Sequence, residues 1–290
     1  SIILVMNPIK LVECPRDALQ GFNIPVSTQM KVEYYQMLLK VGYHTIDCGS
    51  FVSPKAIPQM ADTAEVIQSL DCSETKTKLL TIVANVRGAQ KAVEFENISY
   101  LGYPFSVSEN FQVRNTGKTI KESLVILNEI IKLADLNDKD LVVYLSMGFG
   151  NPYGDLWSTS IIKSWVADLA DMGVKIISLS DTVGSAKTKD IDLLFSELIE
   201  AYPKHELGAH FHAYPDEWYK KVNAAYLAGC KRFDGTIKGI GGCPMAHDEL
   251  IGNIPMEKLI SFFAAQKELD ENYNSIAFEN AVNFSRRIFF

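Results

Sequence analysis

Short apolar runs alternate with longer amphipathic segments along the whole chain. Eight of these runs have the length of β-strands and lie at residues 11–14, 44–48, 79–84, 98–104, 141–146, 175–180, 207–212 and 232–236. Many of them are apolar at both odd and even positions, as expected for strands that are buried on both faces of a parallel sheet. The pattern therefore predicts eight parallel strands.

Amphipathic segments follow the predicted strands and are expected to form helices. They span residues 28–40, 61–70, 89–94, 119–133, 159–171, 190–201, 216–228 and 255–268. Gly42, Gly173 and Gly229 each come shortly before the next strand, where helices commonly end in a left-handed residue. Eight alternations without a long Gly/Pro-rich linker favour an α/β fold, a (β/α)8 TIM barrel with a C-terminal helical segment, over an open doubly wound sheet. We expect one domain over residues 1–290, with a loop at 239–253 and a helical C-terminal part at 255–290.

Two histidines mark the seventh predicted strand. His210 and His212 are two positions apart, so on a strand both imidazoles point to the same face. The C-terminal ends of the strands carry the chemistry in a TIM barrel, which favours a shared metal ion. The alternative is one buried, hydrogen-bonded histidine and one surface histidine, because a motif match alone is a hypothesis.

Polar residues also follow other predicted strands and would meet at the same mouth of a barrel. Arg16 and Asp17 follow the first strand, Asp47 is near the end of the second, and Asp181 and Thr182 follow the sixth. Asp17 is a candidate metal ligand, and Arg16 could stabilise an oxyanion. The other three residues could instead cap helices. Two imidazoles with carboxylate and amide oxygens suit Mg, Mn or Zn better than softer metals.

The cysteines are five in number and include no CxxC spacing. This usage indicates reduced thiols in a cytoplasmic protein rather than a disulfide framework or a zinc site. Cys243 lies in a GGCP segment, where an exposed thiol could donate a proton, whereas most lone cysteines are small buried hydrophobes.

The charge and the hydropathy of the chain limit its partners. The net charge of −7 argues against nucleic acid or an anionic membrane as the main partner. No run approaches the 18 apolar residues of a transmembrane helix. We therefore expect neither nucleic acid nor a membrane as a partner.

Several segments together resemble one known family, the 3-hydroxy-3-methylglutaryl-CoA (HMG-CoA) lyases. These metal-dependent barrels belong to the group that also includes the isopropylmalate synthases. The resemblance covers about residues 11–259 and rests on VECPRDALQ, SFVSPKAIPQMAD, SVSENF, GNPYG, SLSDTVG, HFH, and GIGGCP followed by Gly-Asn at 252–253. The SFVSPKxxPQMAD and GxGGCP segments resemble the lyases rather than the condensing synthases.

The resemblance implies a retro-Claisen cleavage of HMG-CoA to acetyl-CoA and acetoacetate, with Mg or Mn as the cofactor. The implied metal ligands are Asp17, His210, His212 and Asn253. The implied catalytic residues are Arg16 facing the enolate and carbonyl oxygens, Cys243 as the thiol of the GGCP loop, Asp181 as a polar active-site residue, and Asp47 at the position of the usual glutamate. The implied partner is an acyl-CoA substrate, and the resemblance is compatible with a homodimer.

The chain also departs from the family pattern. Asp47 stands where the family usually has glutamate, Cys14 stands where it has glycine, and Ala-Tyr-Pro-Asp follows HFH in place of Asp-Thr-Tyr-Gly. These differences leave two alternatives open. One is a related metal-dependent aldolase or Claisen-type enzyme for a different hydroxyacyl or hydroxy-acid substrate. The other is a catalytically inactive barrel that binds a metal and an acyl ligand.

Overall fold

The computed structural model describes residues 8–242 and 251–290, in which eight parallel strands form a closed barrel. Neighbouring strands pair in chain order from β1 to β8, and the β1–β8 and β6–β7 pairings complete the ring. The strands are β1 (Lys10–Glu13), β2 (Thr45–Ser50), β3 (Lys78–Ile82), β4 (Ile98–Ser106), β5 (Asp140–Ser146), β6 (Ile176–Asp181), β7 (Glu206–Ala213) and β8 (Arg232–Gly235). The predicted TIM barrel is confirmed.

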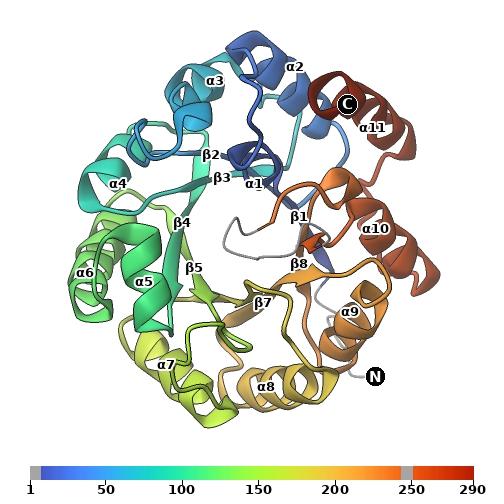
Figure 1. Ribbon diagram of the computed structural model, residues 1–290. Helices are drawn as coiled ribbons and strands as arrows, with labels where there is room; N and C mark the ends of the chain where they lie inside the picture. The colour runs from blue at the N-terminus through green and yellow to red at the C-terminus, as the bar shows by residue number, and fades with distance from the viewer. Residues whose placement is uncertain (1–7, 243–250) are drawn as a thin grey trace, which may run out of the picture.

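Most of the helices surround the barrel and cover the outer face of the strands, whereas the first helix lies nearer the centre of the view (Figure 1). The helices are α1 (Pro15–Gln20), α2 (Thr28–Leu38), α3 (Thr63–Ser69), α4 (Val86–Ala92), α5 (Glu109–Thr116), α6 (Ile120–Leu136), α7 (Thr159–Asp171), α8 (Thr188–Ala201), α9 (Trp218–Leu227), α10 (Met256–Ala265) and α11 (Ser275–Phe289), with short 3-10 helices η1 (Pro58–Met60) and η2 (Ile237–Gly239). The helical C-terminal segment is confirmed as α10 and α11. Gly42, Gly173 and Gly229 have the expected positive φ, at 88°, 98° and 100°.

The predicted strands agree with the observed ones to within two residues at each end, but the helix pattern was incomplete. Helices α1 and α5 were not predicted from the sequence. Pro15 occupies the first turn of α1, where its fixed φ favours a helix start and its missing N–H costs nothing. Arg16 and Asp17 therefore lie on a short helix and not on an extension of the strand.

A ninth, two-residue strand brings the end of the 239–253 segment back to the barrel. Strand β9 (Gly252–Asn253) is antiparallel to β7, with Asn253 opposite His212 and Gly252 opposite Ala213. Residues that are 41 positions apart thus become direct cross-strand neighbours (253 minus 212). This pairing fixes the side chain of Asn253 beside the histidine strand.

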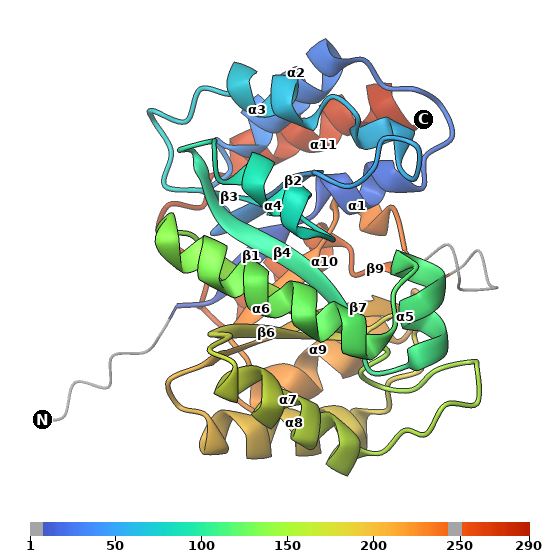
Figure 2. The ribbon, with the colours of Figure 1, turned by 90° about the vertical axis from the view of Figure 1, so that its left-hand side faces the viewer.

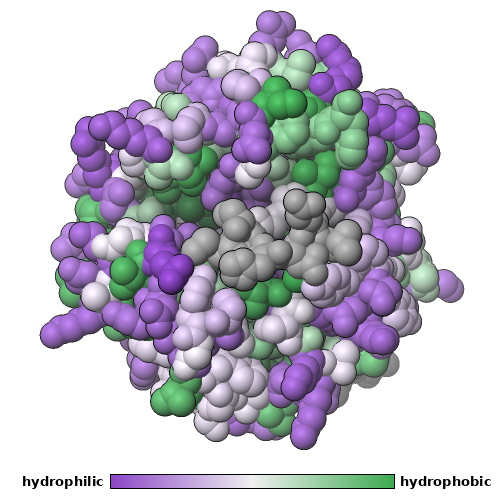
Figure 3. Space-filling model, viewed as in Figure 1, coloured by the Kyte–Doolittle hydropathy of each residue, from purple (hydrophilic) through white to green (hydrophobic). Residues whose placement is uncertain are grey.

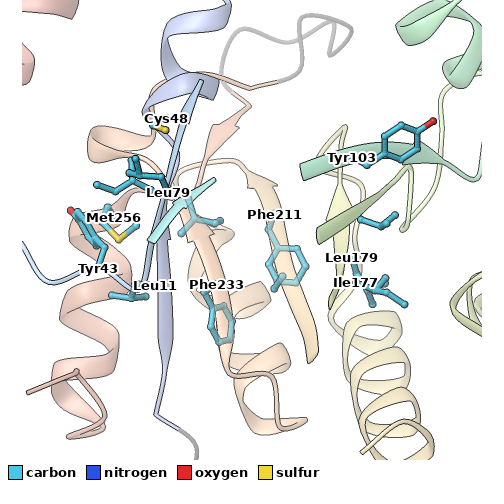
Figure 4. Close-up of a cluster of buried hydrophobic side chains, with 14 of the residues drawn as sticks. Leu11, Tyr43, Cys48, Leu79, Tyr103, Ile177, Leu179, Phe211, Phe233 and Met256 are labelled. Carbon is cyan, nitrogen blue, oxygen red and sulfur yellow. The ribbon is translucent and has the colours of Figure 1, made fainter. Parts of the chain in front are cut away.

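The main core fills the space between the barrel and its helices (Figure 4). Phe211 packs edge-on against Phe149 and Phe195, and Phe233 lies 5.0 Å from Phe263 between ring centroids. A second apolar cluster fills the barrel interior and consists of Leu80, Ile82, Tyr100, Val142, Tyr144 and Ile176. Burial on both faces explains why the strand runs are apolar at both parities.

The N-terminal end of the barrel also contains charged side chains. The Arg232 side chain is fully buried, stacks over the Tyr100 ring at 5.4 Å, and donates from Nη1 to Glu206 Oε1 at 3.1 Å. Lys10 also pairs with Glu206. Two cations therefore share one carboxylate at the N-terminal end of the barrel. Among the helices of the described ranges, none is both long and apolar enough to cross a membrane.

Candidate active site

The side chains with metal-binding chemistry meet at the C-terminal end of the barrel. Asp17 comes from α1, while His210 and His212 come from β7, and one ligand atom from each lies within 4.8 Å of the others. Figure 2 shows α1 and β9 on the same side of the barrel as the C-terminal tip of β4. The surface around this end is hydrophilic over much of its rim (Figure 3). Parallel strands end on one side, which explains the convergence.

His210 is oriented by a carboxylate from the neighbouring strand. Its Nδ1 lies 3.0 Å from Asp234 Oδ2, and its ring meets Tyr144 edge-on at 5.6 Å. Burial lowers the pKa of His210, but the hydrogen bond and charge of Asp234 and the charge of Asp17 outweigh it, so the pKa is raised. A carboxylate on Nδ1 leaves Nε2 to bind a cation. The Cys14 thiol lies beside this pair, and burial raises its pKa well above the usual value, so it stays protonated.

His212 is held by a main-chain group. Its Nδ1 lies 2.9 Å from the carbonyl oxygen of Thr182, which fixes the hydrogen on Nδ1. Burial and the neighbouring His210 lower its pKa to about 4, so the ring is neutral near pH 7. Its Nε2 is buried and has no hydrogen-bond partner among the described residues. A buried lone pair without a donor is costly, and a cation at this point would satisfy it.

Asn253 and Asp17 complete the donor set. Asn253 Nδ2 donates to Asp17 Oδ2 at 2.7 Å and to the Ile240 carbonyl at 3.2 Å, so the amide oxygen is the atom of this side chain that could act as a ligand. Burial raises the pKa of Asp17, but Arg16 and the two histidines outweigh it, and the result is a lowered pKa. The carboxylate is therefore ionised at neutral pH.

Arg16 joins Asp17 to Asp47. Its Nε donates to both oxygens of Asp47 at 3.2 and 3.0 Å, and its Nη2 donates to Oδ2 at 2.5 Å. Its Nη1 donates to Asp17 Oδ1 at 3.2 Å and to Gln20 Oε1 at 2.7 Å. Arginine has five N–H donors, so these contacts leave one N–H of Nη2 without an acceptor among the described residues. Burial raises the pKa of Asp47 to about 6 although Arg16 opposes it.

Asp181 has a different environment from the residues above. Its Oδ2 accepts from Lys221 Nζ at 2.7 Å, and its Oδ1 accepts from the Ala186 amide at 3.1 Å. Burial raises its pKa, while Lys221 opposes the shift. Its carboxylate thus anchors the turn after β6, next to the Thr182 carbonyl that holds His212. Asp181 is therefore linked to His212 through Lys221 and through the turn that contains Thr182.

The helix-cap alternative is wrong for the strand-end residues. The N-cap of α3 is Asp62 and that of α8 is Lys187, so neither Asp47 nor Asp181 caps the helix that follows its strand. Thr182 Oγ1 instead accepts from the Met147 amide at 2.8 Å. The reading of one histidine as a surface residue is also wrong, since His212 is 4% exposed and the His210 side chain 13%.

Two residues that support the candidate ligands were not predicted from the sequence. Asp234 and Lys221 are both buried and charged, and both lie in segments read only as a strand and a helix. A lone carboxylate within the apolar run 232–236 was the available signal for Asp234, since charged groups are rarely buried without a partner. Cys243 lies outside the described residues, so the structure does not place the predicted thiol.

Asp17, His210 and His212, with Asn253 beside them, could hold a divalent cation. Two imidazole nitrogens, a carboxylate and an amide oxygen are hard and intermediate ligands, and the two imidazoles and the amide have their other polar atoms engaged. The unpartnered Nε2 of His212 is the direct sign of fit. Fold and site together define a TIM barrel whose mouth carries residues that could hold a metal ion.

Comparison with known proteins gives the family. The HMGL-like family model matches residues 9–284, so the chain belongs to the HMGL-like family. It is 30% identical over 89% of its length to a hydroxymethylglutaryl-CoA lyase of Bacillus subtilis, covering 85% of that protein. It is 31% identical over 87% of its length to a 3-hydroxy-3-isohexenylglutaryl-CoA/hydroxymethylglutaryl-CoA lyase of Pseudomonas aeruginosa, covering 83% of it.

A solved structure is similar over almost the whole chain. An HMG-CoA lyase from Acinetobacter baumannii, in complex with coenzyme A and 3-methylmalate, superposes with a TM-score of 0.88 at 27% identity. The match covers 97% of this chain and 91% of that chain. The family resemblance expected from the motifs is therefore confirmed.

Proposed function

We propose that this protein is a divalent-metal-dependent carbon–carbon lyase that cleaves HMG-CoA to acetyl-CoA and acetoacetate. The observation that carries the proposal is His212 Nε2, which has no hydrogen-bond partner in the described part of the chain and lies where the donors of Asp17 and His210 converge, in a chain of this family. The relatives from Bacillus subtilis and Pseudomonas aeruginosa bear names for this activity and cover most of the chain.

We assign the metal ligands to Asp17, His210, His212 and Asn253. When bound, the cation supplies a Lewis acid that favours loss of the proton from the substrate's C3 hydroxyl and orients a neighbouring oxygen. The ligands themselves are held rigid: His210 by Asp234, His212 by Thr182, and Asn253 by Asp17. Mg or Mn suits two imidazoles with oxygen ligands.

We assign charge stabilisation to Arg16. Cleavage breaks the C2–C3 bond, and the electron pair moves to the acetyl thioester as an enolate, while the C3 oxygen becomes the carbonyl of acetoacetate. A buried guanidinium whose Nη2 has one N–H to spare can donate to the enolate oxygen. Asp47 fixes the plane of the guanidinium by accepting from Nε and Nη2. This makes Asp47 a positioning residue for Arg16.

The enolate must gain one proton at C2 to become acetyl-CoA, and this offsets the proton lost from the C3 hydroxyl, so the overall cleavage involves no net change in protons. We assign the donor to Cys243, on the strength of its GGCP segment in the predicted catalytic loop 239–253. Gly241 and Asn253 within this loop lie against α1 and β7, so the loop starts and ends at the site. Asp181 anchors the turn beside His212.

We further propose that residues 1–290 act as one domain, that the protein works in the cytoplasm, and that it forms a homodimer. The reduced state expected for the described free cysteines supports the cytoplasmic assignment. The dimer rests on the family resemblance alone. Sedimentation of the purified protein tests it.

The decisive experiment measures acetoacetate release from HMG-CoA by the purified protein with Mg or Mn, before and after chelation. We expect metal-dependent release that falls by at least about 100-fold in Arg16→Gln, because this change removes the charge that faces the enolate. Gln20→Ala is the matched control, since Gln20 accepts from Nη1 and not from the Nη2 that faces the enolate. Release of acetoacetate without any metal would contradict the proposal.

A second substrate is worth testing in the same assay. The Pseudomonas aeruginosa relative is named for 3-hydroxy-3-isohexenylglutaryl-CoA as well as for hydroxymethylglutaryl-CoA. Asp47 and Ala213 also differ from the residues that the family motif leads one to expect. If the bound metal is retained but HMG-CoA is not cleaved, thioesters with larger C3 substituents and free hydroxy acids are compared next.

A further inference from the structure

Lys221 has an environment that is unusual for a lysine. It lies on α9, its side chain is only 3% exposed, and its ammonium group donates three hydrogen bonds. The acceptors are Asp181 Oδ2 at 2.7 Å, the Gly184 carbonyl at 2.9 Å and the His212 carbonyl at 3.0 Å. An ammonium group has three N–H donors, so all of them are used.

All three acceptors lie in the backbone and the turn that hold His212, one of the proposed metal ligands. Lys221 holds the main chain of His212 directly through its carbonyl oxygen. It also holds both ends of the turn that contains Thr182, because Asp181 precedes Thr182 and Gly184 follows it by two residues. The Thr182 carbonyl in turn accepts from the His212 ring at Nδ1. The backbone and the ring of His212 are thus fixed through the same ammonium group.

We propose that Lys221 is a positioning residue for the metal site, which sets the direction of His212 Nε2 by clamping its backbone and the Asp181–Gly184 turn. This inference rests on the proposed metal site. The alternative is that Lys221 serves only as the counter-ion of Asp181. A buried carboxylate without a cation is strongly destabilising, so that role would affect folding but not the geometry of the ligand.

The chain offers a matched control in Lys31. Its side chain is 4% exposed, and its ammonium group also donates to an aspartate, the half-buried Asp62, at 2.7 Å and to a main-chain carbonyl, that of Gln59. This second ion pair joins α2 to the segment before α3, on a different part of the barrel from His212. Lys31→Met therefore measures how the loss of a buried lysine changes the melting temperature where no candidate metal ligand is involved.

The test uses calorimetric binding of Mn²⁺ to the metal-free full-length protein and the visible spectrum of its Co²⁺ form. For Lys221→Met we expect the Mn²⁺ dissociation constant to rise about 10-fold or more, in the range found when groups behind metal ligands are removed. The Co²⁺ bands should shift, because the ligand field at His212 changes. Lys31→Met should lower the melting temperature of the metal-free protein similarly, while its Mn²⁺ constant stays within about 2-fold of the unchanged protein.

A double variant separates the two roles and serves if Lys221→Met does not fold. Lys221→Met with Asp181→Asn removes the uncompensated buried charge, so stability should recover relative to the single variant. The Mn²⁺ constant should stay raised, because the carbonyls of His212 and Gly184 still lack their donor. Recovery of full Mn²⁺ affinity in the double variant, or unchanged affinity in the single one, would overturn the inference. If the unchanged protein binds no Mn²⁺, the proposed metal site itself is wrong, and the positioning role falls with it.

Discussion

Replacement of Asp234 by asparagine tests the hydrogen bond behind His210. Asp234 Oδ2 lies 3.0 Å from His210 Nδ1, and the Asp234 side chain is 1% exposed. Asparagine keeps the shape and a neutral acceptor but removes the charge that strengthens the imidazole as a ligand. Loss of such support typically costs 10- to 100-fold in metal affinity, or about 1.4–2.7 kcal/mol. We expect the Mn²⁺ dissociation constant of Asp234→Asn to rise by this factor at pH 8.

The size of this loss should depend on pH in a defined direction. Asp234 and Asp17 raise the pKa of His210 above its ordinary value against the effect of burial. A proton on His210 competes with the cation, so the unchanged protein loses affinity as the pH falls through that raised pKa. The variant has a smaller upward shift, so its competition begins at lower pH. The ratio of the two dissociation constants should therefore be largest at pH 8 and smaller at pH 6.

Calorimetric titration with Mn²⁺ at pH 6, 7 and 8 measures the effect. Asp62→Asn is the control, because Asp62 also accepts from a buried cation, Lys31, but on another part of the barrel. Its Mn²⁺ constant should match that of the unchanged protein at each pH. Equal affinity of Asp234→Asn and the unchanged protein at pH 8, or a ratio that grows toward pH 6, would refute the argument.

Three further predictions concern the loop, the barrel base and the metal. Gly241 has φ +91°, and an added Cβ would lie 2.8 Å from the Asp17 carbonyl oxygen and 3.0 Å from Asn253 Nδ2, so Gly241→Ala should lower the affinity for Mn²⁺. Gly173→Ala is the control, because Gly173 has a similar φ of +98° but no atom within 4 Å of an added Cβ, and it should lower only the melting temperature. Glu206→Gln should cost about 2 kcal/mol of unfolding free energy at pH 7. Burial raises the pKa of Glu206, but Arg232 and Lys10 outweigh burial, and the pKa is lowered. The stabilisation by the Glu206 carboxylate is therefore present above the ordinary pKa of 4.5 and disappears as the pH falls through the lowered pKa, which urea titrations at pH 7 and pH 3 would measure. Mn²⁺ at 100 times its dissociation constant should raise the unfolding free energy by about 2.7 kcal/mol, and a chelator should reverse this, while an unchanged melting curve would count against a native-state site.

The strand pattern was readable from the sequence because its cause is local. Strands buried on both faces must be apolar at both parities, and eight such runs with helices between them leave few folds to consider. The spacing of His210 and His212 likewise follows from the two-residue repeat of a strand, and both rings lie at the same site. Helix α1 was missed because six residues carry too little periodicity to be recognised.

The position of Asn253 relative to His212 could not be derived from local pattern. It depends on a two-residue antiparallel pairing of β9 with β7, and such a short segment has no alternation to detect. The sequence placed Asn253 among the ligands only through the family motif. The structure shows how the position arises and adds the hydrogen bond to Asp17.

By itself, the sequence determined the barrel, the direction of the two histidines and the strand ends at which charged residues gather, because these follow from periodicity within a few residues. Only the tertiary structure decided which charges support which ligands. The carboxylate of Asp234 meets His210 from the next strand, and Lys221 reaches His212 and Asp181 from the following helix. Buried polar groups need hydrogen-bond partners, but which partner each group meets depends on residues that are far apart in the sequence. A local sequence pattern therefore cannot predict the pairing.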